Sequence, residues 1–447
     1  MHTVRRDRLV FAAVFAAAAT FFLYCWAIQP NRPPLEALGN PADKGWYGAW
    51  IDQSSYASEA RSLARWELPG IYWDHESSKP RADRPPGAEV SAYDYGLGYP
   101  VLGVPFIWLG LEGDPFVIPN GIAFGVAACL IFALARRFFR DRVALLVAAA
   151  VVIATPMVNY FAVPWNTTPT AVAVLLALYI GVSGNRSWRV AIAFGVAASL
   201  VFSARYVDIL WVGALIAPVI LLDFRRSVRI VAVAAPLLLI TAILTLWSHD
   251  RVFGSALETP LHHHIHEGKR GDDLSQYILG DVPEHGISVF VTGRMTNGSR
   301  SPTGFDPLLR NFFWLIFAPI GFVALIRRRA LRSIPPEPAG VLVIAGVASL
   351  LASTFYLSWW AGGGDDIMFH NGRFFVSWFP LWGILAAIGI AEVVKHFGIG
   401  SDYSGASDIN AASSASEPKL AEIDRDPSNR STTAITESAA DEYFTTQ

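Results

Sequence analysis

The sequence predicts an all-α polytopic membrane protein with about ten or eleven transmembrane helices. Hydrophobic residues make up 53% of the 447 residues and charged residues only 16%. The mean hydropathy is +0.37, and apolar runs of spanning length recur along the chain as far as about residue 397. This combination excludes a soluble domain of ordinary composition.

The apolar runs define the expected spans. The first, residues 9–28, follows the charged start MHTVRRDR and lacks a small-residue cleavage site, so we expect an uncleaved helix rather than a signal peptide. Nine more runs follow at 116–136, 143–160, 168–183, 189–204, 207–222, 229–248, 311–326, 339–358 and 374–396. The stretch YPVLGVPFIWLGL, residues 99–111, is too short to cross roughly 30 Å of hydrocarbon, and its two prolines favour a short juxtamembrane or re-entrant helix.

Positive charge sets the expected topology. With about ten crossings, the basic segments RRDR, ARRFFRDR, GNRSWR, DFRRSVR and IRRRALR all fall on the side of the N-terminus, which the positive-inside rule assigns to the cytoplasm. Residues 1–397 would then form the transmembrane domain, with two large external loops at 29–115 and 249–310. Residues 398–447 are rich in Ser, Ala, Thr and acids, and this composition predicts a disordered cytoplasmic tail.

Charge and cysteine content exclude other classes. A net charge of −2 argues against nucleic acid as a partner, because phosphate backbone is bound by a basic surface. The two cysteines, Cys25 and Cys129, both lie in apolar segments, so no disulfide framework is expected in the external loops.

A polar helix is predicted shortly after the first span. The stretch WIDQSSYASEARSLARWELP, residues 50–69, carries Asp52 and Glu59 with scattered apolar anchors such as Tyr56, and such a helix can lie on the membrane surface. On residue chemistry alone, Asp52 is either a helix cap, a role that Asp fills routinely, or a functional carboxylate.

The order of features from this helix onward resembles GT-C fold membrane glycosyltransferases. A polar helix with an acidic residue outside the first crossing precedes the turn YGLGYP, which contains Tyr95 and Tyr99 and leads into an apolar helix. The hairpin NYFAVPWNTTPT, the segment AFGVAASLVFSARYVDILW and the loop WWAGGGDDIMFHNGRFFVSWFPLW also resemble segments of that family, in the same order. The resemblance covers roughly residues 8–397, and each motif alone has low specificity.

That resemblance implies a fold, an activity and site residues. The family, which includes protein mannosyltransferases and aminoarabinose transferases, takes a sugar from a polyprenyl-phosphate or polyprenyl-diphosphate lipid. Asp52 matches the first-loop aspartate proposed there as the general base, which removes a proton from the acceptor hydroxyl. The leaving phosphate needs positive charge at the outer headgroup level. Side chains at external helix ends could supply it: Arg205, Arg310, His370 and Arg373. The alternative for each arginine is snorkelling to lipid headgroups.

Several loop residues are weaker candidates. We expect contacts to the acceptor or the loops from Tyr56, Glu59, Tyr95, Tyr99, Asp365 and Asp366. Many family members carry a second carboxylate beside the first-loop Asp, whereas Gln53 follows Asp52 here, which puts the acceptor class and any metal dependence in doubt.

The tract LHHHIHEGKRGDD invites a metal interpretation. Its candidate ligands are His262, His264, His266 and Glu267. Its spacing lacks the His-Glu-x-x-His pattern and fixes no tetrahedral geometry, so it indicates no dedicated metal site. We expect no required cofactor, although the sequence leaves room for a divalent cation.

The leading hypothesis is therefore an inverting glycosyltransferase in a bacterial or archaeal cell membrane, with its active site on the external face. Its partners would be membrane lipids, a polyprenyl-phosphate-linked sugar, and a glycan, lipid or protein acceptor. The alternative is a transporter or flippase of a lipid-linked sugar. Transporters tend to place ionisable residues near the bilayer midplane, whereas the predicted spans here are nearly free of charge and the polar groups gather at their external ends.

Overall fold

The computed structural model describes residues 2–28, 51–70, 72–74, 79–81, 96–155, 157–257, 313–330, 336–360 and 375–397. Apart from a two-stranded hairpin, the regular elements of these residues are helical. The helices of the first half of the chain are α1 (His2–Ala27), α2 (Ile51–Ala64), α3 (Pro100–Trp108), α4 (Val117–Ala135), α5 (Asp141–Ile153), α6 (Met157–Ala162), α7 (Thr168–Ser183) and α8 (Trp188–Ala204). The others are α9 (Asp208–Leu222), α10 (Phe224–Phe253), the 3-10 helix η4 (Phe313–Phe317), α15 (Ala318–Ala330), α16 (Pro336–Trp360) and α18 (Phe379–His396).

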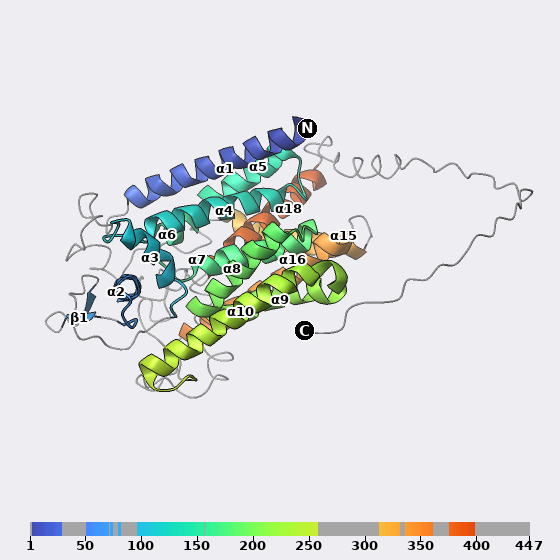
Figure 1. Cartoon of the computed structure of the whole chain (residues 1–447). Coiled ribbons are helices and arrows are strands. Elements are labelled where there is room, and N and C mark those ends of the chain that lie inside the picture. The colour runs from blue at the N-terminus through green and yellow to red at the C-terminus, as the bar shows by residue number, and fades with distance from the viewer. Residues whose placement is uncertain are drawn as a thin grey trace, which may run out of the picture. The chain divides into compact units, whose positions relative to one another are not determined.

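Helix α7 forms the centre of the bundle (Figure 1). It packs against α4, α8, α9 and α16, and almost every residue along it is buried. The most extensive contacts between the described helices are those of α8 with α10 and of α15 with α18. One large apolar cluster joins all of these helices, so helix packing holds the fold together.

The described helices have the dimensions and composition of membrane spans. Four are long and apolar enough to cross a bilayer: Arg6–Ala27, Val117–Ala135, Ser227–Phe253 and Phe379–His396. Five shorter apolar helices accompany them, at Thr168–Ser183, Trp188–Ala204, Asp208–Leu221, Phe313–Arg327 and Gly340–Ser353. The protein is therefore an integral membrane protein, as the sequence predicts.

One predicted span differs from the structure. The apolar run 143–160 is divided, because α5 ends at Ile153 and α6 begins at Met157. Pro156 in the sequence disfavours helical geometry in the residue before it. The side chain of Thr155 takes over part of the hydrogen bonding: its hydroxyl donates to Val151 O (2.7 Å) and accepts from Met157 N (3.4 Å).

Three basic turns meet at one end of the bundle. Arg136, in the turn after α4, pairs with Asp7 of α1 (3.4 Å). Arg137 donates to the carbonyl of Ser183 at the end of α7 (3.4 Å). Arg186 pairs with Asp223 between α9 and α10 (2.9 Å). Four of the five basic segments, RRDR, ARRFFRDR, GNRSWR and DFRRSVR, thus share one side, as the topology prediction requires. The compartment that this side faces stays a prediction.

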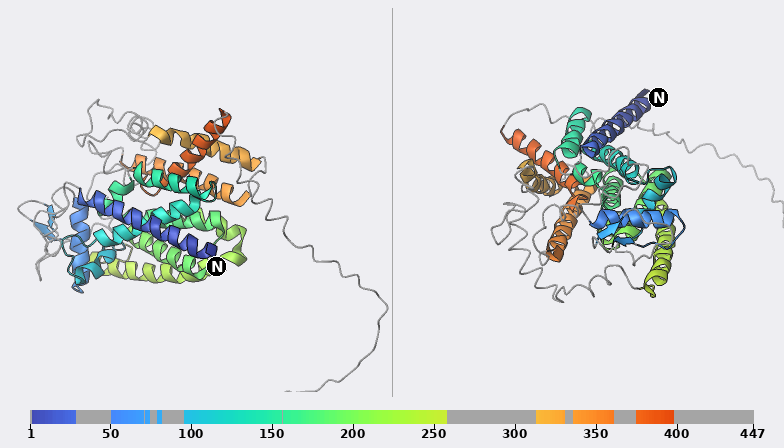
Figure 2. Two further views of the ribbon diagram at one scale, coloured as in Figure 1. Left: turned by 90° about the horizontal axis from the view of Figure 1, so that it is seen from above. Right: turned by 90° about the vertical axis from the view of Figure 1, so that its left-hand side faces the viewer.

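The opposite end carries the shorter elements. Helix α2 lies crosswise over the end of the bundle (Figure 2) and packs on α3. Helix α3, Pro100–Trp108, is the short helix that the sequence predicts within residues 99–111. The strands β1 (Tyr72–Asp74) and β2 (Lys79–Arg81) form an antiparallel hairpin in which Tyr72 faces Arg81. The described residues belong to a compact unit that extends to Ser401, and the predicted tail, 398–447, lies outside them.

Helix α18 approaches α15 and the end of η4 so closely that the contact requires glycine. A Cβ atom on Gly321 would collide with the carbonyl oxygen of Leu385, and one on Gly389 would collide with the carbonyl oxygen of Phe317. Small residues allow membrane helices to pack backbone against backbone.

We expect Gly389→Ala to lower the free energy of unfolding by about 1–3 kcal/mol, because the two helices must move apart. Gly213→Ala is the matched control: a Cβ there meets no atom within 4 Å, and alanine in a helix interior is favoured over glycine by about 0.5–1 kcal/mol. Thermal denaturation of the purified proteins in detergent checks this. Equal midpoints for the two variants would contradict it.

Candidate functional site

Helix α2, which carries Asp52, is enclosed by protein. Residues Gln53 and Ser55 to Ser62 are all buried, including the ionisable Glu59 and Arg61. This corrects the expectation that a helix of this composition is exposed on the membrane surface: other parts of the chain cover α2. Asp52 is the second residue of α2, a position in which a carboxylate is favoured by the helix dipole.

The polar side chains of α2 bond to backbone, and this explains how so polar a helix is buried. The hydroxyl of Ser58 donates to the carbonyl of Gly70 (3.3 Å), and that of Ser62 donates to the carbonyl of Ser58 (3.0 Å). Arg61 donates from Nη2 to the carbonyl of Glu112 in the turn between α3 and α4. These bonds fix α2 to its neighbours, because a buried polar group that loses its partner is costly.

The turn from Gly96 to Tyr99 seats the first loop on α8. A Cβ on Gly96 would collide with the carbonyl oxygen of Ser203, and one on Gly98 would lie 2.6 Å from the backbone nitrogen of Ala204. Only glycine permits such an approach of two backbones. The turn therefore rests on the last turn of α8, directly before Arg205.

Two of the tyrosine candidates are buried in a small core under α2. The rings of Tyr56 and Tyr99 meet edge to face (5.1 Å between centroids), and Tyr99 stacks on Phe116 (4.6 Å). The Tyr99 hydroxyl donates to Oδ1 of Asn120 (3.2 Å) and accepts from its Nδ2 (3.0 Å). Ala204 belongs to the same core, so this core links α2 to the end of α8.

The start of α4 is anchored to α1. Nε1 of Trp26 donates to Oδ2 of Asp114 (2.9 Å), and Oδ1 of the same carboxylate accepts from the backbone nitrogen of Phe116 (3.1 Å). Asp114 thus ties the connection that follows α3 to the end of the first span.

Arg205 lies in a buried polar network. Its Nε pairs with Oδ2 of Asp208 (3.2 Å), and the same oxygen accepts a hydrogen bond from the hydroxyl of Thr170 on α7 (2.7 Å). The Arg205 side chain is 12% exposed and that of Asp208 4%. Asp208 and Thr170 are site residues that sequence reasoning missed. The sequence did contain a signal for Asp208: it stands three residues after Arg205 at the start of a predicted helix, a spacing that allows an ion pair.

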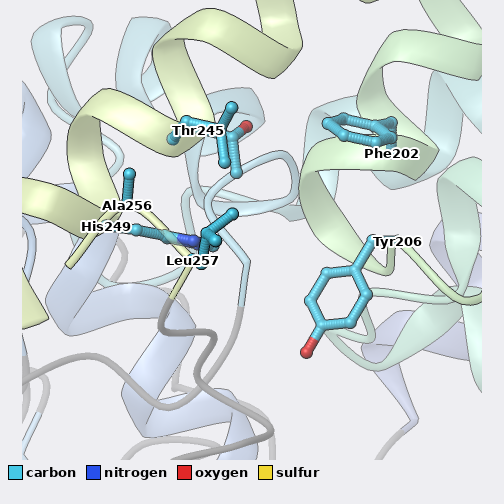
Figure 3. Close-up of a pocket in the computed structure, with 7 residues that line it drawn as sticks. Phe202, Tyr206, Thr245, His249, Ala256 and Leu257 are labelled. Carbon is cyan, nitrogen blue, oxygen red and sulfur yellow. The ribbon is translucent and has the colours of Figure 1, made fainter.

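A small cavity adjoins this end of α8 (Figure 3). It has a volume of about 120 Å³ and lies between the ends of α8 and α10. Phe202 and Tyr206 form one wall, and His249 and Leu257 face them from the other. The lining is almost entirely apolar, which suits a hydrocarbon segment rather than a charged group.

Most of the remaining candidates lie outside the described residues. These are Arg310, His370, Arg373, Tyr95, Asp365, Asp366, His262, His264, His266 and Glu267. The side chain of Asp52 is outside them as well. Among the residues that the structure describes, no group of three His, Cys, Asp or Glu side chains could hold a metal ion.

Comparison with solved structures identifies the fold. The oligosaccharyltransferase of Archaeoglobus fulgidus in its apo form aligns with 91% of this chain and 52% of its own length, with a TM-score of 0.52 and 14% identity. ArnT from Cupriavidus metallidurans bound to undecaprenyl phosphate aligns with 90% of this chain and 63% of its own, with a TM-score of 0.49 and 16% identity. No protein-family model matches the chain, and no curated protein does.

The chain therefore has a GT-C fold, as the resemblance in its sequence predicts. It spans about half the length of the oligosaccharyltransferase that it matches. At this level of identity the likeness establishes the architecture of the chain, and function has to be argued from its own residues.

Proposed function

We propose that this protein is a glycosyltransferase that moves a sugar from a polyprenyl-phosphate or polyprenyl-diphosphate lipid to an acceptor at the external face of the membrane. The observation that carries the proposal is the close packing of the Gly96 to Tyr99 turn on the end of α8. Through this turn, the loop that contains Asp52 is held against the segment that contains Arg205. A base and a phosphate-binding cation are the two groups that such a transfer needs.

In the proposed reaction, Asp52 accepts the proton of the acceptor hydroxyl as that oxygen attacks the anomeric carbon. A new glycosidic bond forms while the bond between the sugar and the lipid phosphate breaks, and the phosphate leaves with the electron pair. Attack from the face opposite the phosphate inverts the anomeric centre. The developing charge on the phosphate is neutralised by Arg205, with Arg373, His370 and Arg310 as further donors.

The network around Arg205 supports this role. Asp208 contacts Nε, on one edge of the guanidinium group, and is itself held by Thr170. The proposal assigns the terminal Nη atoms to phosphate oxygens, because the planar fork of arginine binds such oxygens in pairs. A guanidinium that is held in place before the phosphate arrives loses less conformational entropy on binding.

The test uses membranes that contain the full-length protein and a radiolabelled polyprenyl-phosphate sugar. A transferase releases label from the lipid fraction into a glycan, lipid or protein product, and membranes lacking the protein do not. A flippase leaves the sugar on its lipid but makes it accessible to a membrane-impermeant oxidant from the opposite leaflet. Oxidant access without any transfer would overturn the proposal in favour of the flippase.

A further inference from the structure

Gln53 is a buried amide that makes no hydrogen bond. Its side chain is 0% exposed, and neither Oε1 nor Nε2 has a hydrogen-bond partner among the residues that the structure describes. Leaving buried polar groups in this state costs about 1–3 kcal/mol for each group. Such groups are rare in folded proteins, and a functional role in which a ligand completes the bonding is one explanation for them.

The position of Gln53 on α2 places it near the proposed reaction site. Helical spacing puts it on the face that continues through Tyr56, Ala57 and Ala60. That face packs into the small core that contains Tyr99 and Ala204, the residue before Arg205. Gln53 therefore stands at the N-terminal end of the face that α2 turns toward the end of α8, and it directly follows Asp52 in the chain.

The chemistry of a primary amide restricts what can satisfy it. The amide offers an NH₂ donor and a carbonyl acceptor side by side. A phosphate has only acceptor oxygens and leaves the carbonyl unmet, whereas a cation leaves the NH₂ unmet. Two neighbouring hydroxyl groups can each donate and accept, so a diol satisfies both ends.

We propose that the amide of Gln53 binds hydroxyl groups of the sugar carried by the lipid donor. This inference rests on the proposed function, and it assigns to Gln53 the recognition of an uncharged polyhydroxyl ring beside the base. Gln53 then determines which sugar is transferred, while the phosphate contacts hold the donor.

The test compares wild type with Gln53→Met, which keeps the length of the side chain and removes its polar atoms. Thermal denaturation in detergent, without substrate, is expected to give a midpoint equal to or above that of wild type, because a buried amide without a partner is replaced by an apolar group. Transfer from the labelled polyprenyl-phosphate sugar is expected to fall at least tenfold in kcat/KM. Ser199→Ala is the control: it removes a different buried polar group, a hydroxyl in α8 that has no hydrogen-bond partner among the described residues, and should leave transfer unchanged.

Donors that lack single hydroxyl groups give a second readout. Wild type should use at least one deoxy donor at least tenfold less well than the parent, and Gln53→Met should use the same two donors equally. Two outcomes would overturn the assignment of Gln53 and leave the proposed function standing, provided that wild type transfers sugar. In the first, Gln53→Met transfers sugar as well as wild type does. In the second, both proteins discriminate against the deoxy donor to the same extent. A lower denaturation midpoint for Gln53→Met also overturns it, because the amide would then have a bonding role within the fold. If wild type transfers no sugar, the proposed function and this inference fail together.

Discussion

Replacement of Asp52 by asparagine is expected to lower the rate of sugar transfer by about 100- to 10,000-fold, the range that a positioned general base contributes. Asparagine has nearly the same shape as aspartate but cannot accept the proton of the acceptor hydroxyl. The proposed contacts to the donor phosphate involve other residues, so the KM for the lipid-linked sugar should change little while kcat falls. Initial rates in membranes at matched protein level measure both quantities.

Asp141→Asn is the matched control for this experiment. Asp141 begins α5 at the other end of the bundle, where its carboxylate is 60% exposed and pairs with Arg136. An exposed ion pair of this kind contributes about 0–1 kcal/mol, so its loss should leave transfer within about twofold of wild type. If Asp52→Asn transfers sugar as fast as wild type, Asp52 is not the base. The other acids of the predicted external loops then become the ones to replace: Asp94, which directly precedes Tyr95, and the candidates Asp365 and Asp366.

The spans and the short helix α3 were predictable because they depend on local properties. Apolar runs of sufficient length indicate helices in a membrane protein wherever they pack. The division of the run 143–160 depends on Pro156 and on Thr155, whose side chain bonds to backbone on both sides of the break. The proline is visible in the sequence, but hydropathy predicts a continuous run because it does not fall at that point.

The burial of α2 was not predictable from its composition. A helix with this many polar residues is expected to face water or headgroups, and hydropathy does not register that Ser58, Ser62 and Arg61 bond to backbone carbonyls. The partners of Arg205 were hidden for a different reason. Thr170 lies 38 residues before Asp208, and only the packing of α7 beside α9 brings their side chains together.

Replacement of Arg205 by glutamine is expected to lower kcat/KM for the lipid-linked donor by about 100- to 1,000-fold, the effect of removing one preorganised group that stabilises charge in a transition state. Arg205→Lys should recover only part of this loss, because an ammonium group keeps the charge but cannot bind two phosphate oxygens with a planar fork. Inhibition by the free polyprenyl phosphate, which lacks the sugar, should weaken in parallel. A residue with a purely structural role would not change that inhibition.

Replacement of Asp208 tests whether the ion pair positions Arg205 for phosphate binding or only stabilises the fold. Asp208→Asn keeps the arginine and its charge but removes the carboxylate that holds Nε. If Asp208 positions Arg205, transfer by Asp208→Asn falls, but by less than transfer by Arg205→Gln. The double variant Asp208→Asn/Arg205→Gln is then no slower than Arg205→Gln alone, because the effects of residues that act as a unit do not add. Arg142→Gln, at an exposed position in α5, is the control for loss of a positive charge. Unchanged inhibition by free polyprenyl phosphate in Arg205→Gln would contradict the phosphate assignment and make Arg205 a structural partner of Asp208.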